Sequence, residues 1–211
     1  LACWNYDRTR ALTDGTVQPD GIELTYLNLP VEETFFRMLR YREFEVAEMS
    51  LSSYTVSLFQ DNPPFIAIPV FPSRVFRHGS IFVSAKSGIR EPKDLIGKRV
   101  GNPEYQLTAM VWIRGILYDE FGVAPTAIEY WTGGEEQPGR EEKIALDLPP
   151  EFKVRRIGAN QTLSQMLADG ELDGLYTARS PSTLMSRPKD VRRLFENYAE
   201  VERTYYLKTK I

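Results

Sequence analysis

The hydrophobic pattern of the second half of the chain alternates between short apolar runs and amphipathic stretches. The longest helical pattern spans residues 108–121, where apolar residues recur three and four positions apart before Gly122. The short apolar runs, which predict strands, are residues 99–101, 128–131, 154–157 and 172–176. Because strands alternate with helices, we expect an α/β fold with a mixed, mostly parallel sheet and helices on both faces.

The first half shows a similar alternation. Apolar runs rich in Ile, Val and Phe, or alternating with polar residues, predict strands at residues 2–5, 22–29, 65–71 and 80–85. Helical spacing predicts helices at residues 31–44 and 54–59. The turn-rich, acidic segment 133–150 is interpreted as a surface loop.

Composition excludes several functional classes. The net charge of −3 over 211 residues argues against nucleic-acid binding, which needs a basic excess. With one cysteine, Cys3, and one histidine, His78, the chain has no disulfide framework and no multi-histidine metal centre. No apolar run reaches the length of a membrane span. We therefore expect no resident cofactor, and leave open a metal ion that assists chemistry.

Two segments resemble type 2 periplasmic-binding proteins. Residues 94–101 are similar to the start of the second lobe of that fold, and residues 167–174 to a later helix-to-strand step. The resemblance implies two α/β lobes that face each other across a ligand cleft, with two crossings of the chain. The implied division is lobe one at residues 1–84, lobe two at 85–178, and the second crossover with the start of a return to lobe one at 179–211.

Five segments resemble the 4,5-dihydroxyphthalate decarboxylases, a branch of this fold: residues 5–10, 48–54, 68–78, 101–106 and 131–134. Members of that family continue beyond the equivalent of Ile211, so we expect a later segment to complete lobe one. The resemblance implies a carboxy-lyase that removes one carboxylate from a dihydroxylated aromatic dicarboxylate in aromatic degradation. It implies a small anionic aromatic or dicarboxylate ligand and a cytoplasmic location, and leaves a homo-oligomer open.

Polar residues after predicted strands are the first candidates for binding that ligand. Ser50, Ser52 and Ser53 follow an apolar run and precede a helix, where hydroxyls and free N–H groups can bind an anion. Ordinary helix capping is the alternative. Additional binding candidates at strand ends and at the start of the long helix are Tyr6, Arg8, Tyr105, Gln106, Thr108 and Arg179. A salt-bridged turn is the alternative for Tyr6 and Arg8, and a solvated loop position is the alternative for Gln106.

Arg74, Arg77 and His78 lie between two predicted strands. Guanidinium groups bind carboxylates in a bidentate manner, and imidazole exchanges protons near neutral pH. We predict that Arg74 or Arg77 anchors the ligand and that Arg77 and His78 are the catalytic residues, with His78 as the acid. Both enter a site only if the backbone turns near Gly79. A solvated arginine and a structural histidine are the alternatives.

A second function fits the same fold. A solute-binding protein of an ABC-type transporter would bind a small anion without chemistry. It would work in the periplasm with a transporter permease as its partner, and it would require export.

Overall fold

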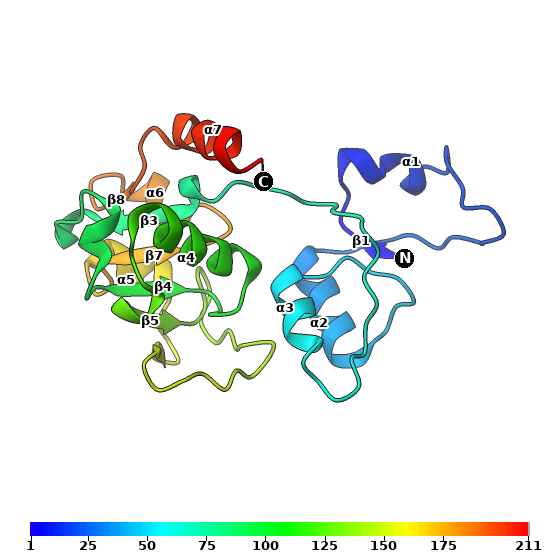
Figure 1. The fold of residues 1–211 in the computed structure, drawn as a ribbon, viewed down its shortest axis with the longest axis horizontal. Coiled ribbons are helices and arrows are strands. Elements are labelled where there is room, and N and C mark those ends of the chain that lie inside the picture. The colour runs from blue at the N-terminus through cyan, green and yellow to red at the C-terminus, as the bar shows by residue number, and fades with distance from the viewer. Residues whose placement is uncertain (211) are drawn as a thin grey trace. The chain divides into compact units, whose positions relative to one another are not determined.

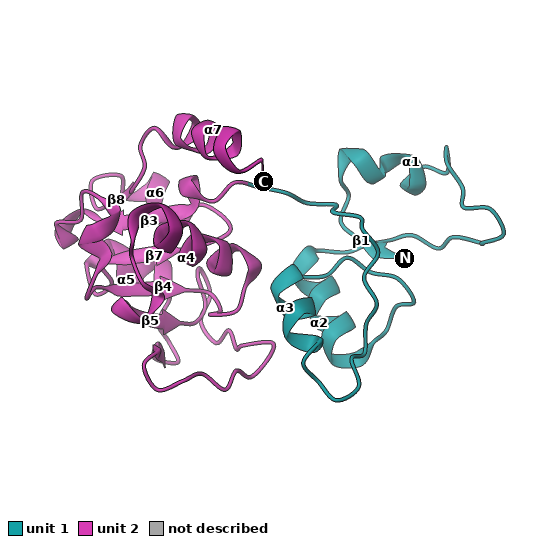
Figure 2. Ribbon diagram, viewed as in Figure 1, with its two compact units in different colours: residues 1–75 teal, residues 76–211 magenta. Residues whose placement is uncertain are grey.

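The computed structural model describes residues 1–210 of the chain. They form two compact units, Leu1–Val75 and a second unit that starts at Phe76 (Figure 2). The division falls before the boundary expected at residues 84 and 85, because the strand that starts at Ile81 pairs within the second unit.

In the part of the chain that the structure describes, the second unit contains a six-stranded mixed sheet with the order β6-β5-β4-β7-β3-β8 (Figure 1). The neighbouring strands β6, β5, β4 and β7 run parallel to one another. Strand β3 pairs antiparallel with both of its neighbours, β7 and β8. The strands are β3 (Ile81–Ser84), β4 (Arg99–Asn102), β5 (Glu129–Thr132), β6 (Lys153–Arg156), β7 (Gly174–Tyr176) and β8 (Val191–Arg193).

Helices cover both faces of this sheet. Helix α4 (Thr108–Phe121) contributes to one buried cluster and α5 (Leu163–Asp169) to the other. The strand residues alternate between them: Val83 belongs to the α4 cluster and Phe82 to the α5 cluster. The predicted α/β class, with a mostly parallel sheet between helices, is therefore confirmed.

Further helices complete the second unit. The α-helices are α6 (Thr183–Ser186) and α7 (Tyr198–Thr209), and the 3-10 helices are η2 (His78–Ser80), η3 (Ala85–Ser87), η4 (Pro92–Leu95) and η5 (Pro125–Ala127). Residues 179–210, expected to start a return to lobe one, lie in the second unit, because β8 is an edge strand of its sheet. Completion of lobe one by a later segment and a ligand cleft between lobes stay predictions.

The first unit has little regular structure. Its elements are β1 (Ala2–Cys3), η1 (Asp7–Thr9), α1 (Arg10–Thr13), β2 (Leu27–Asn28), α2 (Val31–Tyr41) and α3 (Leu51–Ser57). The predicted strand at 65–71 is wrong: this segment forms no strand, and Ile66 within it is 96% exposed. Pro69 cannot donate a ladder hydrogen bond, and β-propensity makes a strand only where a partner strand pairs with it.

None of the helices formed by residues 1–210 is both long enough and apolar enough to cross a bilayer.

Candidate functional site

Three extended segments of the first unit run parallel and end at the same edge. Ala2 of β1 pairs with Leu27 of β2 on one side and with Ala47 on the other. The Ala2 N–H donates to the Val46 carbonyl at 2.9 Å, and the Glu48 N–H donates to the Ala2 carbonyl at 3.0 Å. The residues that follow these segments are therefore brought together at one edge.

The side chain of Glu48 is buried at this edge, with the residue 9% exposed. The Trp4 N–H donates to its Oε1 at 2.7 Å and the Tyr6 hydroxyl donates to its Oε2 at 2.9 Å. Burial raises the pKa of Glu48, although these two hydrogen bonds lower it in part. Burial also raises the pKa of Tyr6, and the nearby charge of Glu48 raises it further. The edge thus holds two coupled acids that keep their protons to higher pH than free side chains do.

The predicted serine cluster lies at the start of α3, directly after the third parallel segment. The Ser50 and Ser52 hydroxyl oxygens are 3.1 Å apart, and Ser50 is 5% exposed while Ser53 is completely buried. The structure thus brings these serines to the edge that carries Glu48. Their binding of a ligand stays a prediction.

Arg8 lies beside the same edge. Its guanidinium carbon is 4.8 Å from the centroid of the Tyr6 ring, its Nε donates to the Pro72 carbonyl, and its Nη1 pairs with Asp7 at 2.8 Å. Arg74 is exposed on the segment that follows α3 and belongs to no helix or strand. Both guanidinium groups are accessible to an anionic ligand within the first unit.

In the second unit, Glu104 is fully buried just beyond the end of β4. Arg140 Nη2 and Lys143 Nζ each lie 2.5 Å from its Oε1, and the Gln106 amide donates to Oε2 at 3.3 Å. The Lys143 N–H also donates to Oε2, at 3.1 Å. These contacts attach segment 135–150 to the end of β4, so the predicted surface loop covers this sheet edge.

Gly134 permits the close approach of that segment. A Cβ atom on Gly134 would lie 1.6 Å from the Gln137 carbonyl oxygen, which no side chain could accommodate. The next residue, Glu135, accepts a hydrogen bond from the Thr177 hydroxyl, and burial raises its pKa. The ends of β5 and β7 are therefore joined through a partly buried carboxyl group.

Tyr105 and Gln106, two predicted binding residues, are engaged inside the second unit. Tyr105 is 6% exposed, and the Arg114 guanidinium carbon lies 3.8 Å from its ring centroid. Arg114 Nη2 donates to the Tyr105 carbonyl at 2.8 Å, while the Tyr105 N–H donates to Glu142 at 2.7 Å. Burial lowers the pKa of Arg114 and raises that of Tyr105. Ligand binding by Tyr105 and Gln106 stays a prediction.

Thr108 and Arg179 follow β4 and β7 respectively. Thr108 is the first residue of α4, and Leu107 occupies the N-cap. Arg179 is exposed, and its N–H donates to the Thr177 hydroxyl at 3.3 Å. Their roles in binding stay predictions.

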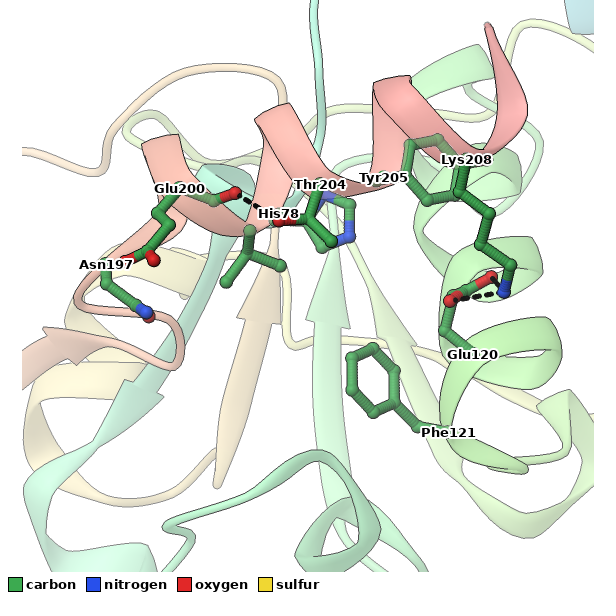
Figure 3. A pocket seen from close by; sticks show the side chains of 9 residues that line it. His78, Glu120, Phe121, Asn197, Glu200, Thr204, Tyr205 and Lys208 are labelled. Atoms are coloured by element: carbon green, nitrogen blue, oxygen red, sulfur yellow. Dashed lines mark hydrogen bonds and ion pairs between the residues drawn. The ribbon is translucent and has the colours of Figure 1, made fainter.

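His78 lines a pocket of about 280 Å³ between α7 and the end of α4 (Figure 3). Its ring is 1% exposed and lies edge-on to Phe195 at 5.5 Å and to Tyr205 at 5.2 Å. An ion pair of 2.8 Å between Lys208 and Glu120 closes one side of the pocket. Burial lowers the pKa of His78, and the charge of Glu120 raises it in part. Burial therefore favours the neutral form of His78, which donates a proton less readily than imidazolium does.

Arg77 precedes the 3-10 helix that carries His78. Burial lowers the pKa of Arg77, and its Nε is buried without a hydrogen-bond partner among residues 1–210. The turn expected near Gly79 is present as η2. A Cβ on Gly79 would lie 2.8 Å from the Tyr198 ring of α7, so the absence of a side chain permits this packing. Catalysis by Arg77 and His78 stays a prediction.

Sequence reasoning missed the buried charged residues of both edges. The sequence could have indicated Glu48, because a carboxylate within the apolar run 46–49 must either be paired or change its pKa. It could not have indicated Arg140 and Lys143, because the segment that contains them has the composition of a solvated loop. Within residues 1–210, no group of three or more His, Cys, Asp or Glu side chains is placed to hold a metal ion.

We predict that Glu104→Gln destabilises the second unit by about 3–5 kcal/mol, because Lys143 and Arg140 lose their buried counter-charge. Urea denaturation of this variant and of Glu141→Gln measures the difference. Glu141 is a matched control, since its 3.6 Å pair with Arg156 is exposed on both sides and should contribute under about 1 kcal/mol. Equal midpoints for the two variants would show that the buried network adds nothing.

We predict that His78→Phe removes part of the acid sensitivity of folding. The unfolded chain takes up a proton on this imidazole at about pH 6.5, whereas burial resists protonation in the folded state, so stability falls as pH drops below that value. Urea denaturation at about pH 7.5 and pH 5.5 should give a smaller loss for His78→Phe than for wild type. His78 is the single histidine, so a similar loss in both proteins would contradict its lowered pKa.

Among solved structures, the chain is similar to the periplasmic aliphatic sulphonate binding protein SsuA of Escherichia coli. The TM-score is 0.48 at 11% identity, over 96% of this chain and 62% of that one. A protein from Archaeoglobus fulgidus gives a TM-score of 0.41 at 18% identity, over 92% of this chain and 57% of that one. Neither identity is high enough to extend a ligand from those proteins to this chain.

Two curated proteins are more similar to the chain in sequence than these solved structures are. No family model matches the chain. The chain is 44% identical over 211 residues to a 4,5-dihydroxyphthalate decarboxylase of Comamonas testosteroni, and spans 64% of that protein, somewhat under two thirds of its length. It is also 44% identical over 197 residues to a protein of the same name from Pseudomonas putida. That match covers 93% of this chain and 76% of the relative. The chain therefore belongs to the family of 4,5-dihydroxyphthalate decarboxylases.

Proposed function

We propose that the protein removes one carboxylate from 4,5-dihydroxyphthalate and releases a dihydroxybenzoate, of the protocatechuate type, and CO₂. The observation that carries this proposal is the 44% identity with curated decarboxylases of that name, extending over the whole chain in one case. The candidate edge of the first unit adds chemistry that such a reaction needs.

The reaction requires three things of its site. A hydroxyl para to the leaving carboxylate must lose its proton, so that electrons move into the ring. The ring carbon that bears this carboxylate must then be protonated, after which its bond to the carboxylate breaks and the electron pair returns to the ring. The retained carboxylate must be anchored throughout. The phenol regains its proton at the end, so the net reaction consumes one proton and releases one CO₂, and it needs no redox cofactor.

The first unit supplies anchoring groups. Ser50 and Ser52 provide adjacent hydroxyls, and Arg8 lies over the Tyr6 ring beside the same edge. Guanidinium and hydroxyl groups bind carboxylates by charge-assisted hydrogen bonds. We assign the retained carboxylate to Arg8, Ser50 and Ser52, with Arg74 as a second exposed guanidinium group in this unit.

The second unit has proposed binding groups of its own. Tyr105 and Gln106 form part of the edge that Glu104 holds together, and Arg179 is exposed beyond β7. Thr108 begins the long helix at this edge. Their hydroxyl, amide and guanidinium groups suit a dihydroxylated dicarboxylate.

A cytoplasmic location is part of the proposal, in keeping with an enzyme of aromatic degradation. The open alternative is a solute-binding protein that binds the same anion without turnover. No contact in the described residues favours it, and the curated relatives carry an enzyme's name.

Incubation of the full protein with 4,5-dihydroxyphthalate tests the proposal. We predict that CO₂ and a dihydroxybenzoate appear in equal amounts, and that phthalate gives neither, since it lacks the hydroxyl that drives electrons into the ring. Tight binding of 4,5-dihydroxyphthalate without release of CO₂ would contradict the proposal and favour the solute-binding alternative.

A further inference from the structure

The buried carboxyl group of Glu48 has no positively charged partner among the described residues. It forms no ion pair within residues 1–210, and no positive charge contributes to the change in its pKa. Both of its carboxyl oxygens instead contact neutral donors, the Trp4 N–H at 2.7 Å and the Tyr6 hydroxyl at 2.9 Å. A buried carboxyl without a counter-charge favours its protonated form.

The groups that face Glu48 add no positive charge close to it. Cys3, on β1, is buried and forms no disulfide, and Tyr26 hydrogen-bonds to the Trp4 carbonyl at 3.0 Å. The nearest cation of this edge, Arg8, is directed to the Tyr6 ring, to Pro72 and to Asp7. The surroundings therefore leave the proton of Glu48 available to one side chain, that of Tyr6.

Tyr6 connects this buried acid to the outside of the edge. It is partly exposed, whereas Glu48 lies behind it with 9% exposure. Arg8, on the ring face of Tyr6, is also exposed. Because the Arg8 guanidinium carbon is 4.8 Å from the centroid of the Tyr6 ring, a carboxylate bound by Arg8 would lie beside the Tyr6 side chain.

We propose that Tyr6, in place of the predicted His78, is the catalytic acid of the decarboxylation and that Glu48 is the positioning residue that resupplies its proton. This inference rests on the proposed function. When Glu48 is protonated, the 2.9 Å contact reverses, so that Oε2–H donates to the tyrosine oxygen and the Tyr6 O–H turns toward the substrate. The Tyr6 hydroxyl then gives its proton to the ring carbon that carries the leaving carboxylate, and the Glu48 carboxyl gives its proton to the tyrosine oxygen. The bond to the carboxylate then breaks, CO₂ leaves, and the ring regains its electron pair. Water returns one proton to Glu48 after each turnover.

Burial explains why the two residues act together. A tyrosinate is disfavoured here, because burial raises the pKa of Tyr6. Transfer of the Glu48 proton onto the tyrosine oxygen avoids that charge. The rate should therefore depend on protonated Glu48, and it should fall as pH rises through the raised pKa of that carboxyl.

Glu48→Gln tests the inference while keeping the shape of the site. The amide oxygen can accept from Trp4 and the amide nitrogen can donate to Tyr6, but no proton can be passed on. In the full protein we expect kcat to fall about 100-fold with KM changed less than about threefold, and the decline of kcat at high pH to disappear. Glu45→Gln is the matched control, an exposed glutamate three residues earlier, and should keep wild-type kinetics.

Tyr6→Phe provides a second test that leaves the contact between Glu48 and Trp4 in place. It should lose kcat to a similar extent, and the double variant should lose no more than either single variant, because the two residues act as one unit. A Glu48→Gln protein with wild-type kcat and an unchanged pH profile would overturn the inference, as would a fully active Tyr6→Phe. Absence of CO₂ release by wild type would instead overturn the proposed function itself.

Discussion

Parallel pairing of short strands is the constraint on which both candidate edges depend. In the first unit, one residue of β1 is bonded to segments on each side, and Glu48 and the serines of α3 follow directly from that alignment. In the second unit, β4, β5 and β7 end together, which places Glu104 and Thr177 where segment 135–150 can cover them. The carboxyl ends of parallel strands lie at the same edge of a sheet. The pairing of the strands is therefore enough to bring the polar residues that follow them close together.

Glu104 and Glu48 are both buried carboxyl groups, but they differ in their partners. Glu104 is compensated by two cations, so its charge serves to attach a loop to the sheet. Glu48 has only neutral hydrogen-bond partners, so burial raises its pKa. The first arrangement is structural, and the second leaves a proton available for transfer.

Sequence patterns predicted most elements of the second unit because its strands and helices pack against each other as their periodicity requires. The helix at residues 108–121 has the bounds the pattern indicated. Segment 65–71 shows the limit of such patterns: its apolar residues resemble a strand, but no partner strand pairs with it in the structure. At the site, the sequence indicated Tyr6 and the serines from their places after apolar runs. It could not indicate that Arg140 and Lys143 fold back onto Glu104, because that contact depends on the path of a loop.

The proposed proton transfer depends most directly on the proton of Glu48. Carbon-13 NMR of the side-chain carboxyl, with Glu48→Gln used to assign its signal, follows the titration of this group. We predict that Glu48 ionises at a higher pH than the value of about 4.3 for a free glutamate side chain, because burial without a cation raises its pKa. A Glu48 carboxyl that ionises at that value, or below it, would contradict the proposal.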